Sequence, residues 1–264
     1  AGEYTNDVEV EYVEAGNGTF SPLTIKDPSA TALDYNNISV HDTYLHDTGG
    51  EGTYQGQTTA DPVHLINGLR FYNNRLVRLG NEGIQIGQQG TNNEIYNNVI
   101  VMPATRFRSP FQESQYFGVQ LGYRNGGNKF YNNVVLGSGE QLVSVIQTAK
   151  TGYPSNGLSN DITNNALQFG KGFIGNYIGE QSALAGVQYN FNDNVIGNFK
   201  FKADKVFKST APNAVNTQQV LRAGTTNQPV NMLNNIRDNT KTTMIANATT
   251  YTVANTTVMT TLPT

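Results

Sequence analysis

The chain has 264 residues, a formal net charge of −3 and 14% charged residues, with 27 glycines, 14 tyrosines and no cysteine. The near-neutral charge gives no electrostatic footprint for nucleic acid. The lack of cysteine excludes disulfides, thiolate metal sites and a cysteine nucleophile. No apolar run is long enough to predict membrane insertion, and the abundance of Gly, Asn, Thr and Tyr favours an all-β chain rich in turns.

A motif recurs along the chain, in which two polar residues, most often Asn-Asn, stand inside an apolar run. Its copies lie at 38–45, 69–77, 93–101, 128–136, 160–168 and 190–198, with a further candidate at Asn234 and Asn235. The second polar residue of each copy is, in order, Thr43, Asn74, Asn98, Asn133, Asn165 and Asn194, at spacings of 24 to 35 residues.

Each copy is followed by a short apolar run, a loop and an alternating segment, which glycines flank in the first three of the four cases: 52–56, 83–87, 118–122 and the looser 142–146. Each unit therefore contains three short strands, and the stretch 8–26 resembles a complete unit as well. Such units stack best as a solenoid, in which each strand pairs in parallel with its equivalent in the next coil. The sequence predicts a right-handed parallel β-helix of about seven coils.

The paired asparagines fit this interpretation. Asn tolerates the left-handed backbone of a sharp bend and bonds nearby backbone groups with its side chain. Stacked from coil to coil, the amides form a ladder. Ordinary hairpin turns are the alternative, but they prefer Asn-Gly to Asn-Asn.

We place the β-helix at 1–208 and interpret the Thr- and Asn-rich stretch 209–264 as an irregular C-terminal cap or the start of a linker. Because the first unit begins close to residue 1, we expect further domains of the same chain or a neighbouring subunit to cover the N-terminal coil.

The alternating segments offer a candidate binding surface. If Ile84 and Ile86 face the core, Gln85 faces outward, and Tyr54 and Gln120 occupy equivalent places. An exposed row of an aromatic ring and amides suits a sugar surface. A solvated polar face without a ligand is the alternative.

Acidic residues enter these segments at comparable places: Glu51, Glu82 and Glu140. Stacking brings their carboxylates together along one edge, and like charges in a row are costly unless a cation neutralises them. Such oxygen ligands suit Ca²⁺. Alternatively, the acids keep a sheet edge soluble.

The stretch 101–122 inserts a long loop that includes Arg106, Arg108, Glu113 and Tyr116. Arginines are suited to grip and neutralise a uronate, and Glu113 adds a polar substrate contact. In β-elimination of a uronate polymer, Arg106 or Arg108 would neutralise the carboxylate and Tyr116 or His46 would exchange protons. The more ordinary interpretation of His46, as of His41, is a histidine in a turn bonded to backbone.

The units "LRFYNNRLVRLGNEGIQIG" and "NKFYNNVVLGSGEQLVSVI" resemble the β-helix repeats of the pectate-lyase-like superfamily, over roughly residues 5 to 208. This resemblance implies the fold but not one activity, since the superfamily includes lyases, hydrolases, epimerases, tailspikes and adhesins. The stretch 80–87 is similar to the acidic stretch of the chondroitinase B and alginate lyase group, in which a carboxylate helps to hold Ca²⁺ near a lysine and an arginine. That similarity falls on Asn81 and Glu82. Gln85 stands where a basic residue is expected, so we assign no lysine base.

These patterns predict a secreted or cell-surface protein that engages a polysaccharide and acts as a uronate polysaccharide lyase. The alternative is a non-catalytic adhesin or structural module of a larger extracellular protein.

Overall fold

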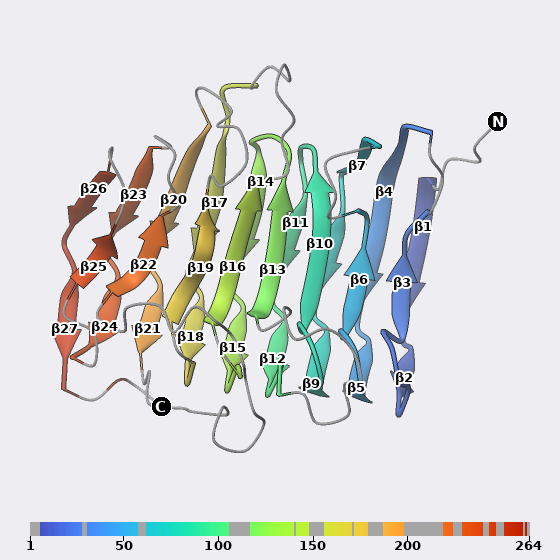
Figure 1. Ribbon diagram of the computed structural model, residues 1–264, viewed down its shortest axis with the longest axis horizontal. Coiled ribbons are helices and arrows are strands. Elements are labelled where there is room, and N and C mark those ends of the chain that lie inside the picture. The colour runs from blue at the N-terminus through green and yellow to red at the C-terminus, as the bar shows by residue number, and fades with distance from the viewer. Residues whose placement is uncertain are drawn as a thin grey trace.

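The computed structural model describes residues 6–27, 31–57, 62–105, 117–139, 141–147, 156–170, 172–178, 187–197, 219–223, 229–239, 243–246, 251–260 and 262. Every regular element in these ranges is a β-strand, and the strands stand side by side along the long axis of the molecule (Figure 1). The chain passes in turn through three groups of strands, which we name the first, second and third faces.

The first face consists of β1 (Asn6–Glu11), β4 (Leu33–His41), β7 (His64–Asn67), β8 (Arg70–Tyr72), β11 (Glu94–Tyr96), β14 (Asn128–Tyr131), β17 (Ser159–Thr163), β20 (Gln188–Asn192), β23 (Val230–Leu233) and β26 (Tyr251–Ala254). The second face consists of β2 (Glu14–Gly16), β5 (Tyr44–Thr48), β9 (Arg75–Leu79), β12 (Val99–Val101), β15 (Val134–Leu136), β18 (Ala166–Gln168), β21 (Val195–Gly197), β24 (Ile236–Asp238) and β27 (Thr257–Met259).

The third face consists of β3 (Leu23–Ile25), β6 (Thr53–Gln55), β10 (Ile84–Gln89), β13 (Phe117–Tyr123), β16 (Gln141–Gln147), β19 (Gly172–Ile178), β22 (Gln219–Ala223) and β25 (Thr243–Ala246). Hydrogen bonds join the first and third faces into one 18-stranded sheet, and the second face is a separate sheet of nine strands.

Equivalent strands pair in parallel from one coil to the next, as β11 does with β14, β12 with β15 and β10 with β13. The prediction of an all-β parallel β-helix is confirmed. The parallel stacking continues in β22 to β27, which lie beyond residue 208. Each of these strands pairs with the equivalent strand of the preceding coil.

The core consists of in-register rows of apolar side chains that point inward from each face. On the first face, Phe71, Ile95 and Phe130 are neighbours in register and are fully buried. Leu76, Ile100 and Val135 form the matching row on the second face, where they are also fully buried. Because each row extends through every coil, the hydrophobic contribution to stability is spread along the whole stack.

The two members of each polar pair have different roles. The first member adopts the left-handed conformation, with φ between 51° and 58°, at Asp42, Asn73, Asn97, Asn132, Asn164, Asp193 and Asn234. The second member is buried and forms the expected ladder, which begins at Thr43 and runs to Asn235. Asn235 therefore confirms the seventh copy of the motif.

One ladder residue illustrates the bonding. The Nδ2 group of Asn98 donates to Asn133 Oδ1 at 2.9 Å and to the Phe71 carbonyl at 3.0 Å. Its Oδ1 accepts from the backbone N–H and the Nδ2 group of Asn74. The ladder thus satisfies the polar groups of a bend that lies inside the protein.

Candidate functional site

The corner between the second and third faces positions the two acidic residues. A Cβ atom at Gly83 would lie 2.5 Å from Ile100 Cγ2, and one at Gly52 would lie 2.8 Å from Leu76 Cδ2. Only glycine leaves room for these core side chains, which explains why a glycine follows each glutamate.

Glu51 and Glu82 occupy equivalent places at this corner, as expected. The pairing of Thr53 with Ile84 sets the register, and the Gly52 N–H donates to the Glu82 carbonyl at 2.9 Å. Both side chains are buried, with exposed fractions of 1% for Glu51 and 0% for Glu82. The sequence pattern did not predict this burial, because alternation gives no measure of how deep a corner side chain lies.

Asn81 connects the two coils at this corner. Its Nδ2 group donates to Glu51 Oε1 at 3.3 Å, and its own side chain is buried. The other carboxylate oxygen of Glu51, Oε2, is buried and has no hydrogen-bond partner among the described residues. A buried carboxylate oxygen without a partner is costly and calls for a specific explanation.

The predicted row on the third face is present in register. Gln85 pairs with Tyr54 on one side and with Gln120 on the other, and Gln120 pairs with Ser144. Ile84 and Ile86, between which Gln85 lies, are fully buried in the core.

The prediction that this row is exposed is wrong. The exposed fraction is 8% for Tyr54, 2% for Gln85 and 6% for Gln120. Alternation correctly gives the side of the sheet from which each side chain leaves. It does not show what else lies over the sheet, and each member is also flanked by its neighbours at the strand spacing of about 4.8 Å.

Lys26 is a site residue that the sequence analysis missed. It follows β3, and its Nζ donates to Tyr54 Oη at 3.0 Å and lies 4.2 Å from the centroid of that ring. The signal was available, since the stretch 8–26 reads as a complete unit. Aligning Thr24 with Tyr54 places Lys26 two residues after Thr24, in the coil next to Tyr54.

His46 lies away from the row. It belongs to β5 on the second face, and its ring nitrogens face Asp47 and Glu14. Its contacts with carboxylates also correct the interpretation that it is bonded to backbone. Arg106, Arg108, Glu113, Tyr116 and Glu140 lie outside the described residues.

The part of the chain that the structure describes contains no group of three or more His, Asp or Glu side chains placed to hold a metal ion. The corner itself contains a buried carboxylate pair and the Asn81 amide. The row that follows it adds further amides and the Tyr54 phenol, which the Lys26 ammonium group contacts. Together these groups include hydrogen-bond donors and acceptors on four consecutive coils.

No protein-family model matches the chain, and neither a curated protein nor a solved structure matches it. Among the described residues, no helix has the length and apolar character that crossing a bilayer requires.

Proposed function

We propose that this protein is a secreted or cell-surface β-helix of the pectate-lyase-like type that binds a polysaccharide where the second and third faces meet. The observation that carries the proposal is the buried Glu51 carboxylate, whose Oε2 has no partner among the described residues, one coil from Glu82. Buried polar atoms that serve only the fold normally have partners. The unpaired oxygen therefore favours a ligand that donates hydrogen bonds, as sugar hydroxyls do.

The neighbouring row supports the same class of ligand. Ser144 Oγ, which belongs to that row, is also buried and has no partner among the described residues. Tyr54 contributes a ring and Gln120 an amide, and the Lys26 ammonium adds a positive charge. A ring, amides and a cation suit an acidic sugar.

A uronate polysaccharide lyase is the catalytic form of this proposal. Arg106 or Arg108 would neutralise the uronate carboxylate, and Tyr116 would exchange the proton. Ca²⁺ takes six to eight oxygen ligands, whereas the only carboxylates at the described corner are those of Glu51 and Glu82, with the Asn81 amide beside them. The described residues alone do not form a calcium site, and the proposal does not depend on one.

A non-catalytic adhesin or structural module is the second candidate. The observation that favours it is the low exposure of the row, 2% for Gln85, which leaves little surface for a polymer to reach. In this form the outer surface contacts the glycan, and the buried groups serve only to hold adjacent coils together.

The test is a panel of alginate, pectate, chondroitin and a neutral glucan, each with and without Ca²⁺. Binding is followed by calorimetry, and lyase turnover by the ultraviolet absorbance of an unsaturated uronate. We expect binding to one of the acidic polymers. The absence of binding to all four would contradict the proposal.

Variants separate the two candidates. Glu51→Gln and Tyr54→Phe should weaken binding by roughly tenfold or more, whereas the matched control Glu94→Gln, on the first face, should not. Turnover that is lost in Arg106→Ala and Arg108→Ala supports the lyase. Binding without any unsaturated product supports the adhesin.

A further inference from the structure

Two His-Asp dipeptides lie at the boundary between the first and second coils. His41 ends β4 and is the register partner of Glu11, while His46 lies in β5 and is the partner of Gly16. The equivalents of His41 in the next three coils are tyrosines: Tyr72, Tyr96 and Tyr131. Within the described strands, histidine thus enters these two rows only where they meet the segment Asn6–Gly16, which we name the N-terminal coil.

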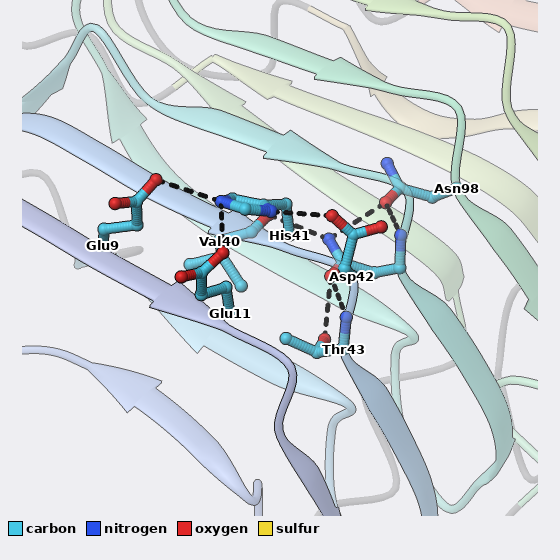
Figure 2. A network of polar contacts seen from close by, with 8 residues as sticks. Glu9, Glu11, Val40, His41, Asp42, Thr43 and Asn98 are labelled. Atoms are coloured by element: carbon cyan, nitrogen blue, oxygen red, sulfur yellow. Dashed lines mark hydrogen bonds and ion pairs between the residues drawn. The ribbon is translucent and has the colours of Figure 1, made fainter.

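Both ring nitrogens of His41 face carboxylates. Nδ1 lies 2.8 Å from Asp42 Oδ2, and Nε2 lies 3.1 Å from Glu9 Oε1 and 3.8 Å from Glu11 Oε2. Figure 2 shows the ring between the two glutamates of β1 on one side and Asp42 on the other. Asp42 has a φ of 51° and occupies the left-handed position that asparagine takes in most of the later coils.

His46 repeats the arrangement on the second face. Its Nδ1 lies 2.7 Å from Asp47 Oδ2, and its Nε2 lies 3.3 Å from Glu14 Oε1 of β2. Asp47 in turn accepts a hydrogen bond from Arg78 Nε of β9 at 2.6 Å.

Aromatic rings complete the surroundings of both histidines. The Tyr72 ring of β8 stacks on His41 at a centroid distance of 4.6 Å, and Tyr12 contacts the His41 ring edge-on. Tyr44 stacks on His46 at 4.2 Å. These contacts fix the planes of the imidazoles, so each ring keeps both nitrogens directed at carboxylates.

This geometry requires the protonated ring. A carboxylate only accepts hydrogen bonds, and a neutral imidazole has one N–H, so only the imidazolium satisfies carboxylates at both nitrogens. The hydrogen bond to Asp42, followed by that to Glu9, raises the pKa of His41 above its ordinary 6.5, and partial burial opposes this rise.

We propose that His41 and His46 form a proton-controlled lock that holds the N-terminal coil on the rest of the β-helix. The lock does not depend on glycan binding. Below pH 6.5 the His41 imidazole is charged and bridges the two coils. His46 adds a second contact across the same boundary, between β5 and Glu14 of β2. As the pH rises through the raised pKa of His41, a ring nitrogen without a proton comes to face a carboxylate oxygen, and the attraction is lost.

Loss of the lock would loosen the pairing of β1 with β4 and of β2 with β5. The backbone groups of β4 and β5 would then be open to another strand, because a parallel edge is a template for pairing. The Tyr44 amide is a direct probe of this loosening, since its N–H donates to the Val13 carbonyl of the N-terminal coil at 2.8 Å.

The test is hydrogen exchange of the intact chain, expressed as protection factors so that the intrinsic effect of pH is removed. Between about pH 5 and about pH 9, protection of the Tyr44 amide and of the β1 and β2 amides should fall by roughly threefold to tenfold. The β12 amides in the same sample should keep their protection, which shows that the rest of the fold is intact. Equal protection of the N-terminal coil at both pH values would overturn the proposal.

Variants and a titration test the residues. The double variant H41Q/H46Q should lose the pH dependence, and Glu94→Gln, which faces neither histidine, should retain it. An NMR titration of the unmodified chain should show the His41 ring losing its proton above pH 6.5. Titration below that value, or wild-type pH dependence in H41Q/H46Q, would show that the histidines do not form the lock.

Discussion

The Nδ2 group of Asn98 lies 2.9 Å from Oδ1 of Asn133 in the next coil, and both side chains are buried. Asn98→Ala removes this bond, takes a donor from the Phe71 carbonyl and leaves the buried Asn74 backbone N–H without its acceptor. We expect the free energy of unfolding to fall by about 3 kcal/mol, measured by chemical denaturation. A loss below about 1 kcal/mol would mean that water replaces the ladder at little cost.

Asn97, the preceding residue, offers a matched pair of variants because it is exposed and has a φ of 56°. Asn97→Val should cost about 1–2 kcal/mol, since a β-branched residue is strained in the left-handed region. Asn97→Gly should be nearly neutral. Equal costs for the two variants in chemical denaturation would show that the side chain, and not the backbone conformation, matters here.

Gly83 marks the corner that positions Glu82. Its missing Cβ would clash with Ile100 Cγ2 and the Gly118 carbonyl, so Gly83→Ala should destabilise the fold by about 1–3 kcal/mol. Gly18→Ala is the control, because its Cβ would meet its nearest neighbour at an ordinary 3.5 Å. Thermal unfolding of the two variants and of the unmodified chain tests whether Gly83→Ala, and not Gly18→Ala, lowers the stability.

Glu51→Gln should separate stability from binding. Replacing a buried carboxylate that has an unpartnered oxygen with a neutral amide relieves an electrostatic cost. We therefore expect unfolding stability that is equal to or higher than that of the unmodified chain, together with weaker polysaccharide binding. Denaturation and calorimetry on the same sample measure the two effects. Reduced stability with unchanged binding would assign Glu51 to the fold alone.

Asp47 should contribute stability that disappears in acid. Hydrogen bonds from Arg78 and then His46 hold the pKa of Asp47 well below its ordinary 3.8. Because the folded-state pKa is lowered, the contribution is present above pH 3.8 and is lost as the pH falls through the lowered value. Asp47→Asn should therefore be less stable than the unmodified chain at pH 7, by an amount reduced by solvent screening. Chemical denaturation at pH 7 and in strong acid should show that the free energies of unfolding of the variant and of the unmodified chain converge in acid.

The sequence predicted the parts of the fold that depend on local chemistry. Each coil has a buried bend whose polar groups are satisfied by an asparagine such as Asn74, so the recurrence of these asparagines reveals the ladder. The alternation about Gln85 likewise gives the correct row. A second ladder, of Asn93, Asn128 and Asn160, was missed because only Asn93 follows another asparagine, so no Asn-Asn pair recurs at these positions.

The site was harder to predict than the fold. Lys26 reaches Tyr54 from the neighbouring coil, and Gln85 is buried although it alternates with the core residues Ile84 and Ile86. Neither relationship is visible in a strand considered alone. In the same way, the Thr-rich composition after residue 208 concealed strands that pair like the earlier ones.

The ladder also has a consequence for how the chain folds. Its rungs join residues 24 to 41 positions apart, whether they lie near the start of the stack or near its end. Contact separation therefore does not grow with the length of the protein, and closing each loop costs a similar amount of entropy. Folding can begin at any well-formed coil and spread to its neighbours, with each completed coil acting as the template for the next.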